Sequence, residues 1–463
     1  MTHPVTANQS LINHRRCIVF FLIIATLTGC INQTSSATQP EDVFLTPGRK
    51  ITFFVFTPTD TPPDADIYLD LVDDVTGINL NPERHKMTSI SENLYSFELH
   101  VQDGSFLKYR YAMGSNPTVI EHNTFGKPVQ YRVFANQVDD PLVARDVIAS
   151  WTDSPINVSL GRLKGILIDT STGAGIPDML INLNGMQATS TLTGEFLLSN
   201  ALPGKYLLTL YSKDGQYGPF QQEAIIAPEA CTPVELSLTA HPTVQITFKI
   251  TPPADHVPSS PIRLIGNIQS LGNSFSVSPS DTDIIPIKAP EMELQPDGTY
   301  SLTIDIPSGI DLRYKYTMGD GFWNAERLSD GQFVTRQLII PDENTTIQET
   351  IASWHAGNRQ PITLQAIQKE TGDSPDQLYI QLNSFTWTAP LPMWQANNGE
   401  WQYKIYSPLY LFPSIGYRFC WDEICDTVIP LDEDQILEPE RIPTDGSQIF
   451  IQHTIPSHTH KSD

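Results

Sequence analysis

The chain lacks any helical pattern of apolar residues that persists for three turns, which argues against an α-helical core. Short runs that alternate apolar and polar residues occur instead, for example at residues 300–306, and turn pairs such as Asp297-Gly298 separate them. The 37 prolines and 27 glycines fit many short connections. We therefore expect an all-β chain of tandem β-sandwich modules.

Basic residues are also scarce. Lysine and arginine total 28 against 52 aspartates and glutamates, which gives a formal net charge of −24 at pH 7. Such a chain repels duplex nucleic acid and anionic membrane surfaces, so no nucleic-acid partner is expected. A neutral partner is the expectation.

Catalytic signatures are missing. The sequence contains no Gly-x-Ser-x-Gly, no His-Glu-x-x-His and no phosphate loop. A glycosidase needs two carboxylates that face each other across a cleft, and modules of this size seldom enclose one. We expect no catalysis and no cofactor.

Cysteines are few. Cys420 and Cys425 flank a four-residue turn, and no further Cys or His nearby completes a metal site. In an oxidising compartment we expect them to form a hairpin disulfide. Cys231 stands alone and is expected to be a buried, small apolar residue.

The chain does contain an internal repeat. Tyr-Arg-Tyr-Ala-Met-Gly at residues 109–114 returns as Tyr-Lys-Tyr-Thr-Met-Gly at 314–319, and Ile-Ala-Ser-Trp closes both copies at 148–151 and 351–354. A more divergent copy follows, because Gly-Glu-Trp-Gln-Tyr at 399–403 and Tyr-Arg-Phe at 417–419 keep the same order. A module of about 100 residues is therefore repeated.

Proline-rich and polar segments divide the chain into modules. The repeat comprises copy one (residues 47–154), copy two (242–357) and a degenerate copy three (361–455). An intercalated module of a different type occupies residues 158–240.

The N-terminal 29 residues are typical of a secretion signal, with a basic segment at 14–16 and a short apolar segment at 17–25. The apolar run is too short to span a bilayer. It ends in Leu-Thr-Gly-Cys at 27–30, which resembles the bacterial lipobox and implies lipidation of Cys30. The alternative is a simple secreted protein with a cysteine after the signal. Residues 30–46, rich in Ser, Thr, Gln and Pro, are expected to form a flexible tether.

The intercalated module contains Gly-Arg-Leu-Lys-Gly at 161–165, Thr-Gly-Glu-Phe at 193–196 and Leu-Pro-Gly-Lys-Tyr at 202–206. These motifs resemble the carboxypeptidase regulatory-like domain, a prealbumin-like (transthyretin-like) β-sandwich. Gly194 and Gly204 are expected to serve turns, while Phe196 and Tyr206 fill the core. The resemblance implies a spacer without catalytic residues.

The repeat resembles the starch-binding domains of amylases and glucoamylases, carbohydrate-binding modules with an immunoglobulin-like sandwich. The closest stretches are residues 262–272 and 312–316 of copy two. The resemblance implies that tryptophan planes stack on glucose units while a cationic or amide side chain bonds the hydroxyls. Affinity per module is expected to be weak, so repetition helps.

The resemblance implies the following binding residues. The family has two stacking tryptophans, here called the first and second platforms, and a binding lysine. In copy two, Lys315 matches the lysine and Trp323 the second platform, while Ser274 stands at the first platform position. In copy one, Leu80 stands where a tryptophan is expected, although Arg110 matches the lysine.

Copy three matches the family's binding positions more completely than copies one and two. Trp387 matches the first platform, and Arg418 and Trp421 match the strand and turn of the second. Trp323, Trp387 and Trp421 are expected at exposed turns, where the alternative to binding is a solvent-facing aromatic side chain that covers an edge. A core role is the expectation for Trp401 and for the module-closing Trp151 and Trp354.

Together these features predict a lipid-anchored protein of the cell envelope, on its extracellular or periplasmic face, that binds α-glucan or a related neutral polysaccharide without cleaving it. The rival interpretation is a structural or adhesive envelope spacer that has lost its ligand. A third is delivery of substrate to a separate extracellular glycoside hydrolase.

Lipidation of Cys30 predicts that the protein partitions into detergent when it is expressed in a bacterial host. Cys30→Ala should move it to the soluble fraction or leave it unprocessed, as fractionation and immunoblotting would show. Equal membrane association of the variant would contradict lipid attachment.

Overall fold

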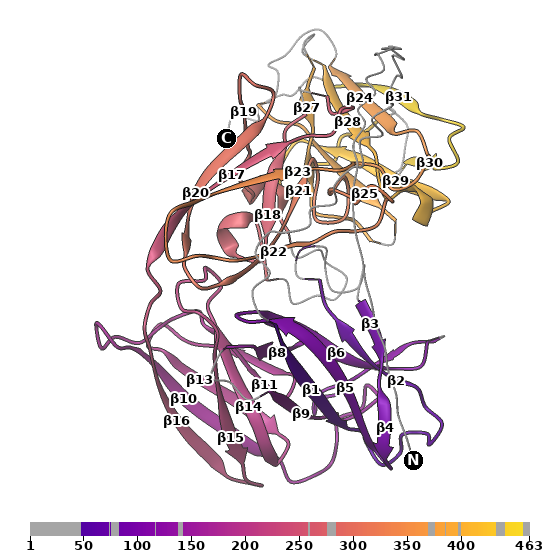
Figure 1. Cartoon of the computed structure of the whole chain (residues 1–463). Helices are drawn as coiled ribbons and strands as arrows, with labels where there is room; N and C mark the ends of the chain where they lie inside the picture. Colours follow the sequence, from indigo (N-terminus) through magenta and orange to yellow (C-terminus); the bar gives the residue numbers. More distant parts are fainter. Residues whose placement is uncertain are drawn as a thin grey trace, which may run out of the picture. The chain divides into compact units, whose positions relative to one another are not determined.

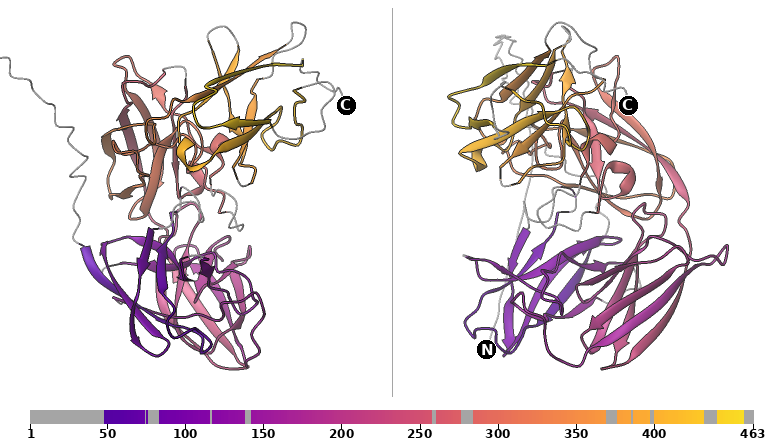
Figure 2. Two further views of the ribbon diagram at one scale, coloured as in Figure 1. Left: turned by 90° about the vertical axis from the view of Figure 1, so that its right-hand side faces the viewer. Right: turned by 180° about the vertical axis from the view of Figure 1, so that it is seen from behind.

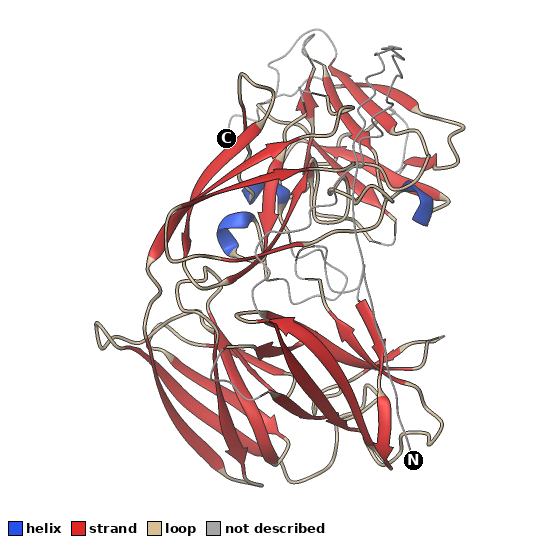
Figure 3. Cartoon of the chain, in the orientation of Figure 1, coloured by secondary structure: helices blue, strands red, loops and turns tan. Residues whose placement is uncertain are grey.

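The computed structural model describes residues 48–73, 75, 83–115, 117–137, 142–257, 260–275, 284–368, 376–384, 386–396, 400–431 and 440–456. Within these residues the chain forms short strands and three 3₁₀ helices (Figure 3). The prediction of an all-β chain of tandem sandwiches is confirmed. In this part of the chain, no helix has the length and apolar character needed to cross a bilayer. Cys30 lies outside the described residues.

Copy one is a sandwich of two sheets. Its strands are β1 (Gly48–Phe56), β2 (Ile67–Leu71), β3 (Glu83–Lys86), β4 (Thr88–Ser91), β5 (Leu94–Gln102), β6 (Phe106–Met113), β7 (Val119–Ile120), β8 (Arg132–Ala135) and β9 (Val143–Val147). One sheet has the order β4-β5-β1-β9, and the other β3-β2-β6-β7 with β8 also paired to β6. Alternate residues of β1, Ile51, Phe53 and Val55, are fully buried in the core between the sheets.

The intercalated module is a second sandwich. Its strands are β10 (Gly161–Asp169), β11 (Leu180–Leu183), β12 (Met186–Thr189), β13 (Glu195–Ala201), β14 (Gly204–Tyr211), β15 (Phe220–Ile226) and β16 (Cys231–Leu238). The sheets are β13-β10-β16 and β12-β11-β14-β15. Phe196 and Tyr206 lie in the core, as expected. Cys231 is exposed at the start of edge strand β16, so the expectation that it is buried is wrong.

Copy two repeats the plan of copy one. Its elements are β17 (Thr243–Thr251), β18 (Arg263–Gly266), η1 (Gln269–Leu271), η2 (Pro286–Lys288), β19 (Glu293–Leu294), β20 (Tyr300–Pro307), β21 (Asp311–Thr317), β22 (Arg336–Ile339) and β23 (Thr345–Thr350). The sheets are β19-β20-β17-β23 and β18-β21-β22. Its core includes Trp354, which is fully buried, and the counterpart Trp151 is buried in copy one, as expected for both.

Copy three has the same two layers. Its elements are β24 (Ile362–Gln368), β25 (Tyr379–Asn383), β26 (Leu391–Pro392), β27 (Trp394–Gln395), β28 (Trp401–Ile405), η3 (Leu409–Leu411), β29 (Ser414–Cys420), β30 (Glu440–Pro443) and β31 (Phe450–Ile455). The sheets are β27-β28-β24-β31 and β26-β25-β29-β30. Trp401 belongs to the core, which confirms the prediction for this residue.

Each sandwich closes in the same way: its first strand pairs in parallel with its last. The pairs are β1 with β9, β10 with β16, β17 with β23 and β24 with β31. The colours in Figures 1 and 2 show the start and the end of each module side by side. The opening and closing motifs of the repeat are therefore neighbours in space.

A buried ionic cluster joins the two sheets of copy one. The Arg132 guanidinium on β8 donates to both carboxylate oxygens of Glu121, at 3.0 and 2.7 Å, and to Asp146 on β9 at 3.0 Å. The hydroxyls of Tyr109 and Tyr111 on β6 both donate to Asp146 at 2.8 Å. Burial alone would lower the pKa of Arg132, but the two carboxylates raise it well above its ordinary value.

Copy two contains the same cluster. The Arg336 guanidinium on β22 donates to both oxygens of Glu326, at 2.9 and 2.7 Å, and to Glu349 on β23 at 3.0 Å. Tyr314 and Tyr316 on β21 donate to Glu349 at 3.0 and 2.6 Å. The tyrosine pair that marks the repeat in the sequence thus belongs to a cross-sheet cluster.

Removing one partner of such a cluster leaves an uncompensated buried charge. Arg336→Met should therefore lower the free energy of unfolding by roughly 3–5 kcal/mol. Lys50→Met is the matched control, because the Lys50–Glu98 pair is about half exposed and should contribute less than about 1 kcal/mol. Urea denaturation followed by tryptophan fluorescence measures both changes. Similar losses in the two variants would contradict a structural role for the cluster.

Candidate functional site

The structure buries the residues of copy two that were expected to bind sugar. The Trp323 side chain is 1% exposed and belongs to the same hydrophobic cluster as the core of copy three, with its ring centroid 5.6 Å from that of Phe412. Lys315 is fully buried and forms an ion pair with Asp73 of copy one at 2.9 Å. The expectation that Trp323 lies exposed at a turn is wrong, and Lys315 is not available to a ligand in this structure.

The turn that carries Trp323 is fixed by hydrogen bonds. The Asp320 carboxylate accepts the backbone N–H of Phe322 at 2.7 Å and of Trp323 at 2.6 Å. The Asn324 side chain donates to the carbonyl of Lys404 at 2.6 Å and accepts the N–H of Tyr406 at 2.8 Å. Copies two and three therefore share a core at this junction, and residues 361–455 alone would expose apolar surface that Phe322 and Trp323 cover.

Asp320 is a buried carboxyl group at this junction. Burial raises its pKa to about 6, although the two backbone N–H groups act in the opposite direction. Its second oxygen, Oδ2, has no hydrogen-bond partner among the described residues. An ionised carboxylate is costly in such a place.

In copy three, the structure brings two of the expected binding residues, Trp387 and Arg418, together. The Arg418 guanidinium lies over the ring of Trp387, with 4.1 Å between Cζ and the ring centroid. Arg418 on β29 lies opposite Gln381 on β25 in the strand register. Trp387 is half-buried, so part of its indole remains accessible.

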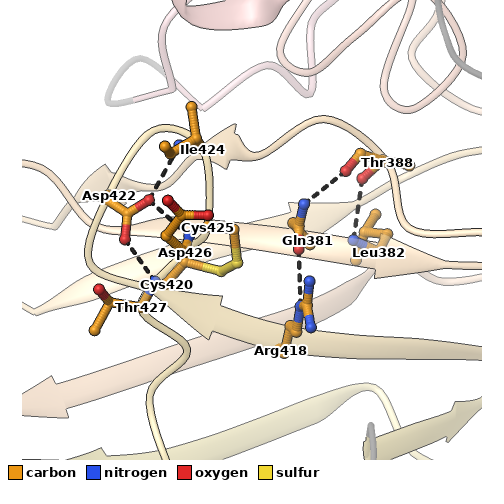
Figure 4. Close-up of a disulfide and its surroundings, with 10 residues drawn as sticks. All are labelled: Gln381, Leu382, Thr388, Arg418, Cys420, Asp422, Ile424, Cys425, Asp426 and Thr427. Carbon is orange, nitrogen blue, oxygen red and sulfur yellow. Dashed lines mark hydrogen bonds between the residues drawn. A yellow bond between two sulfur atoms is a disulfide. The ribbon is translucent and has the colours of Figure 1, made fainter.

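Gln381 holds this pair in place. Its side-chain oxygen accepts a hydrogen bond from Nε of Arg418 at 2.8 Å, and its amide nitrogen donates to the carbonyl of Thr388 at 2.9 Å. Figure 4 shows Gln381 between these two partners. The amide therefore links the strand that carries Arg418 to the segment that carries Trp387.

Gln381 was not identified from the sequence. It alternates with Ile380 and Leu382, which are fully buried in the core, so its side chain belongs to the outer face of the sheet. The signal that could have identified it is a polar residue between two core residues, in the strand that precedes Trp387.

Trp421 directly follows β29. It packs, partly buried, against the core cluster of copy three, whereas Trp387 stacks on Arg418. Side chains alternate along β29, so Arg418 and Cys420 share one face while Tyr417 and Phe419 face the core. Trp421 follows in the core phase, and a stacking surface shared by Trp387 and Trp421 stays a prediction.

A disulfide and three hydrogen bonds constrain the loop that follows β29. Cys420 and Cys425 form the expected disulfide, with 5.1 Å between their Cα atoms. The Asp422 carboxylate accepts the backbone N–H of Ile424, Asp426 and Thr427 at 3.2, 2.9 and 2.8 Å (Figure 4). Burial alone would raise the pKa of Asp422, but these hydrogen bonds lower it overall.

Comparison with known proteins gives partial similarity. No family model matches the chain. The chain is 28% identical over 156 residues to an amylopullulanase of Thermoanaerobacter thermohydrosulfuricus, covering 33% of this chain and 10% of that protein. It is 30% identical over 110 residues to an amylopullulanase of Thermoanaerobacterium thermosulfurigenes, covering 23% and 6%. The chain thus spans a tenth or less of the length of these relatives.

Solved structures resemble the chain at low scores. Hormoconis resinae glucoamylase matches with a TM-score of 0.18 and 20% identity, covering 24% of this chain and 18% of that one. A streptococcal ancillary pilin matches with a TM-score of 0.24 and 11% identity, covering 65% and 99%. The Bacillus anthracis TIE protein matches with a TM-score of 0.18 and 12% identity, covering 89% and 69%.

The raised pKa of Asp320 predicts an unusual dependence of stability on pH. Between its ordinary pKa of 3.8 and about 6, the unfolded state is ionised while the folded state keeps its proton, so this group lowers stability as pH rises. The difference corresponds to roughly 3 kcal/mol once both states are ionised. Asp320→Asn, which keeps an acceptor oxygen, should be more stable than the wild type above pH 6 and similar to it near pH 4.

Asp422→Asn is the control, because the pKa shift of Asp422 has the opposite sign to that of Asp320. The folded-state pKa of Asp422 is lowered, so its contribution is present at neutral pH and is lost on acidification. This variant should lose stability at pH 7. Urea midpoints measured from pH 4 to 8 test both changes, and a pH profile that Asp320→Asn leaves unaltered would refute the role given to Asp320.

Proposed function

We propose that the protein binds an α-glucan or a related polysaccharide without cleaving it, through Trp387, Arg418 and Gln381 of copy three. The observation that carries the proposal is the half-buried indole of Trp387, stacked on Arg418 at 4.1 Å. The similarity to segments of two amylopullulanases supports a glucan as the ligand.

The chemistry of the site suits a sugar. A pyranose has an apolar face of C–H groups that packs on an indole, and an aromatic side chain loses little rotamer entropy on binding. The guanidinium of Arg418 offers donors for the hydroxyls. Each such hydrogen bond adds only modestly because it replaces one to water. Affinity at one site should therefore be low.

Attachment to the cell envelope through a lipid on Cys30 forms part of the proposal. An anchored chain that holds glucan near the surface would raise the concentration of substrate available to a separate extracellular glycoside hydrolase. The support for this part is the Leu-Thr-Gly-Cys motif at residues 27–30.

An envelope spacer is the second candidate. Trp323 and Lys315, the matched residues of copy two, serve packing and an ion pair instead of an exposed surface. A repeat that has used its binding residues for contacts between modules fits a structural role. The two candidates differ in whether Trp387 affects binding.

Native gel electrophoresis of the full mature chain in soluble starch, glycogen, pullulan and xylan separates them. The wild type should be retarded by α-glucans, and Trp387→Ala should weaken binding by roughly 1–3 kcal/mol, the scale of losing one aromatic contact. Leu192→Ala is the control, since Leu192 is 86% exposed in the intercalated module. A folded wild type that migrates alike with and without every glucan would favour the spacer.

A further inference from the structure

We propose that the Trp387 site prefers a glycan that carries an acidic group, either a carboxylate or a phosphate ester, and that the terminal nitrogens of Arg418 recognise it. This inference rests on the proposed function, because it specifies the ligand of the same site. The inference depends on which hydrogen bonds and ion pairs Arg418 makes within the described residues.

Arg418 has no carboxylate partner among the described residues. Its Nε atom donates to the amide oxygen of Gln381, which is neutral, and its planar face covers Trp387. Neither Nη1 nor Nη2 makes a hydrogen bond or an ion pair within the described part of the chain. By contrast, Arg132 and Arg336 each hold two carboxylates.

Asp422 of the nearby loop uses its carboxylate within that loop and forms no ion pair with Arg418. Both oxygens of Asp422 accept backbone N–H groups of its own loop, as Figure 4 shows. Partial burial lowers the pKa of Arg418 somewhat from its ordinary value, and the group stays cationic at neutral pH. Although the chain has 52 acidic and 28 basic residues, none of the carboxylates in its described part forms an ion pair with this cation.

The orientation of the Arg418 guanidinium makes its two terminal nitrogens selective for an acidic group. Gln381 fixes the Nε side of the guanidinium and Trp387 fixes its plane, so two terminal nitrogens are presented in one orientation. Such a fork matches two oxygens of a carboxylate or phosphate, whereas a hydroxyl fills only one position. A hydrogen bond to an ionised acceptor also contributes more than one to a hydroxyl.

The charge of the whole chain limits the ligand further. The net charge of −24 repels a densely charged polyanion at long range. The contact with Arg418 acts at short range, where salt screens it less. The site should therefore favour a largely neutral glucan with sparse acidic groups over a fully charged one.

The test compares three ligands of matched chain length on the full mature protein: neutral α-glucan, the same glucan sparsely oxidised to carboxylates at C6, and the same glucan sparsely phosphorylated. Affinities are measured by calorimetry at two salt concentrations. At least one acidic form should bind on the order of fivefold more tightly than the neutral form, and the advantage should persist at the higher salt concentration because the contact is short-range. The preferred acidic form identifies the group.

Two substitutions assign the preference to Arg418. Arg418→Gln should remove it while retaining part of the binding of neutral glucan, and Arg418→Lys should preserve some of it. Arg441→Gln is the matched control, because Arg441 lies on neighbouring β30 and bonds Ser414 instead of a carboxylate. The control should keep the full preference.

The outcomes separate the two proposals. Equal affinity for all three ligands would overturn the acidic preference and leave glucan binding intact. A preference that survives in Arg418→Gln would overturn the role of Arg418. Absence of binding to any of the three would overturn the preference together with the proposed function.

Discussion

The cross-sheet cluster of one arginine, two carboxylates and two tyrosines is the interaction on which copies one and two depend. Its two tyrosines share one strand, β6 or β21, while the arginine and the two carboxylates come from other strands or loops. Asp146 or Glu349 lies in the sheet opposite to the tyrosines. Because the charges are buried, they are tolerated only when every partner is in place. The cluster therefore fixes how the last strand of each copy meets the rest of the sandwich.

Copy three shows what happens when this cluster is replaced. Tyr417 on β29 remains, but its hydroxyl bonds His453 on β31 at 2.6 Å and Glu440 on β30 at 3.3 Å. Phe419 stands two residues on, in the strand phase of the second tyrosine of the other copies. The positions still join the two sheets, with less charge in the core. This simpler arrangement accompanies a core that is completed by Phe322 and Trp323 of copy two.

The duplicated modules have thus diverged in the use of the same surface. In copy two, the aromatic turn is buried against copy three and serves the junction between modules. In copy three, the corresponding turn carries Trp421, which packs partly buried against the core, while Trp387 at the first platform position stacks on Arg418, an arginine that Gln381 orients. Binding and association between modules compete for aromatic side chains, since both remove them from water.

The sequence by itself determined the all-β class, because strand periodicity and turn residues are local signals. It also determined the disulfide between Cys420 and Cys425 and the core positions of Trp151, Trp354 and Trp401, since repeats and spacing constrain them. These features depend on neighbours along the chain or on the phase of a single strand.

Only the tertiary structure decided which tryptophans are accessible. Trp323 lies in a turn between Asp320 and Asn324, so nothing local predicts that another module covers it. β29 ends at Cys420, whose side chain lies on the outer face of the sheet, so Trp421, the next residue, points toward the core. Which face Trp421 occupies therefore depends on the pairing of β29. Gln381 acquires its role because β25 pairs with β29 in a register that sets it opposite Arg418. Burial and register are long-range properties, and residues distant in the sequence decide them.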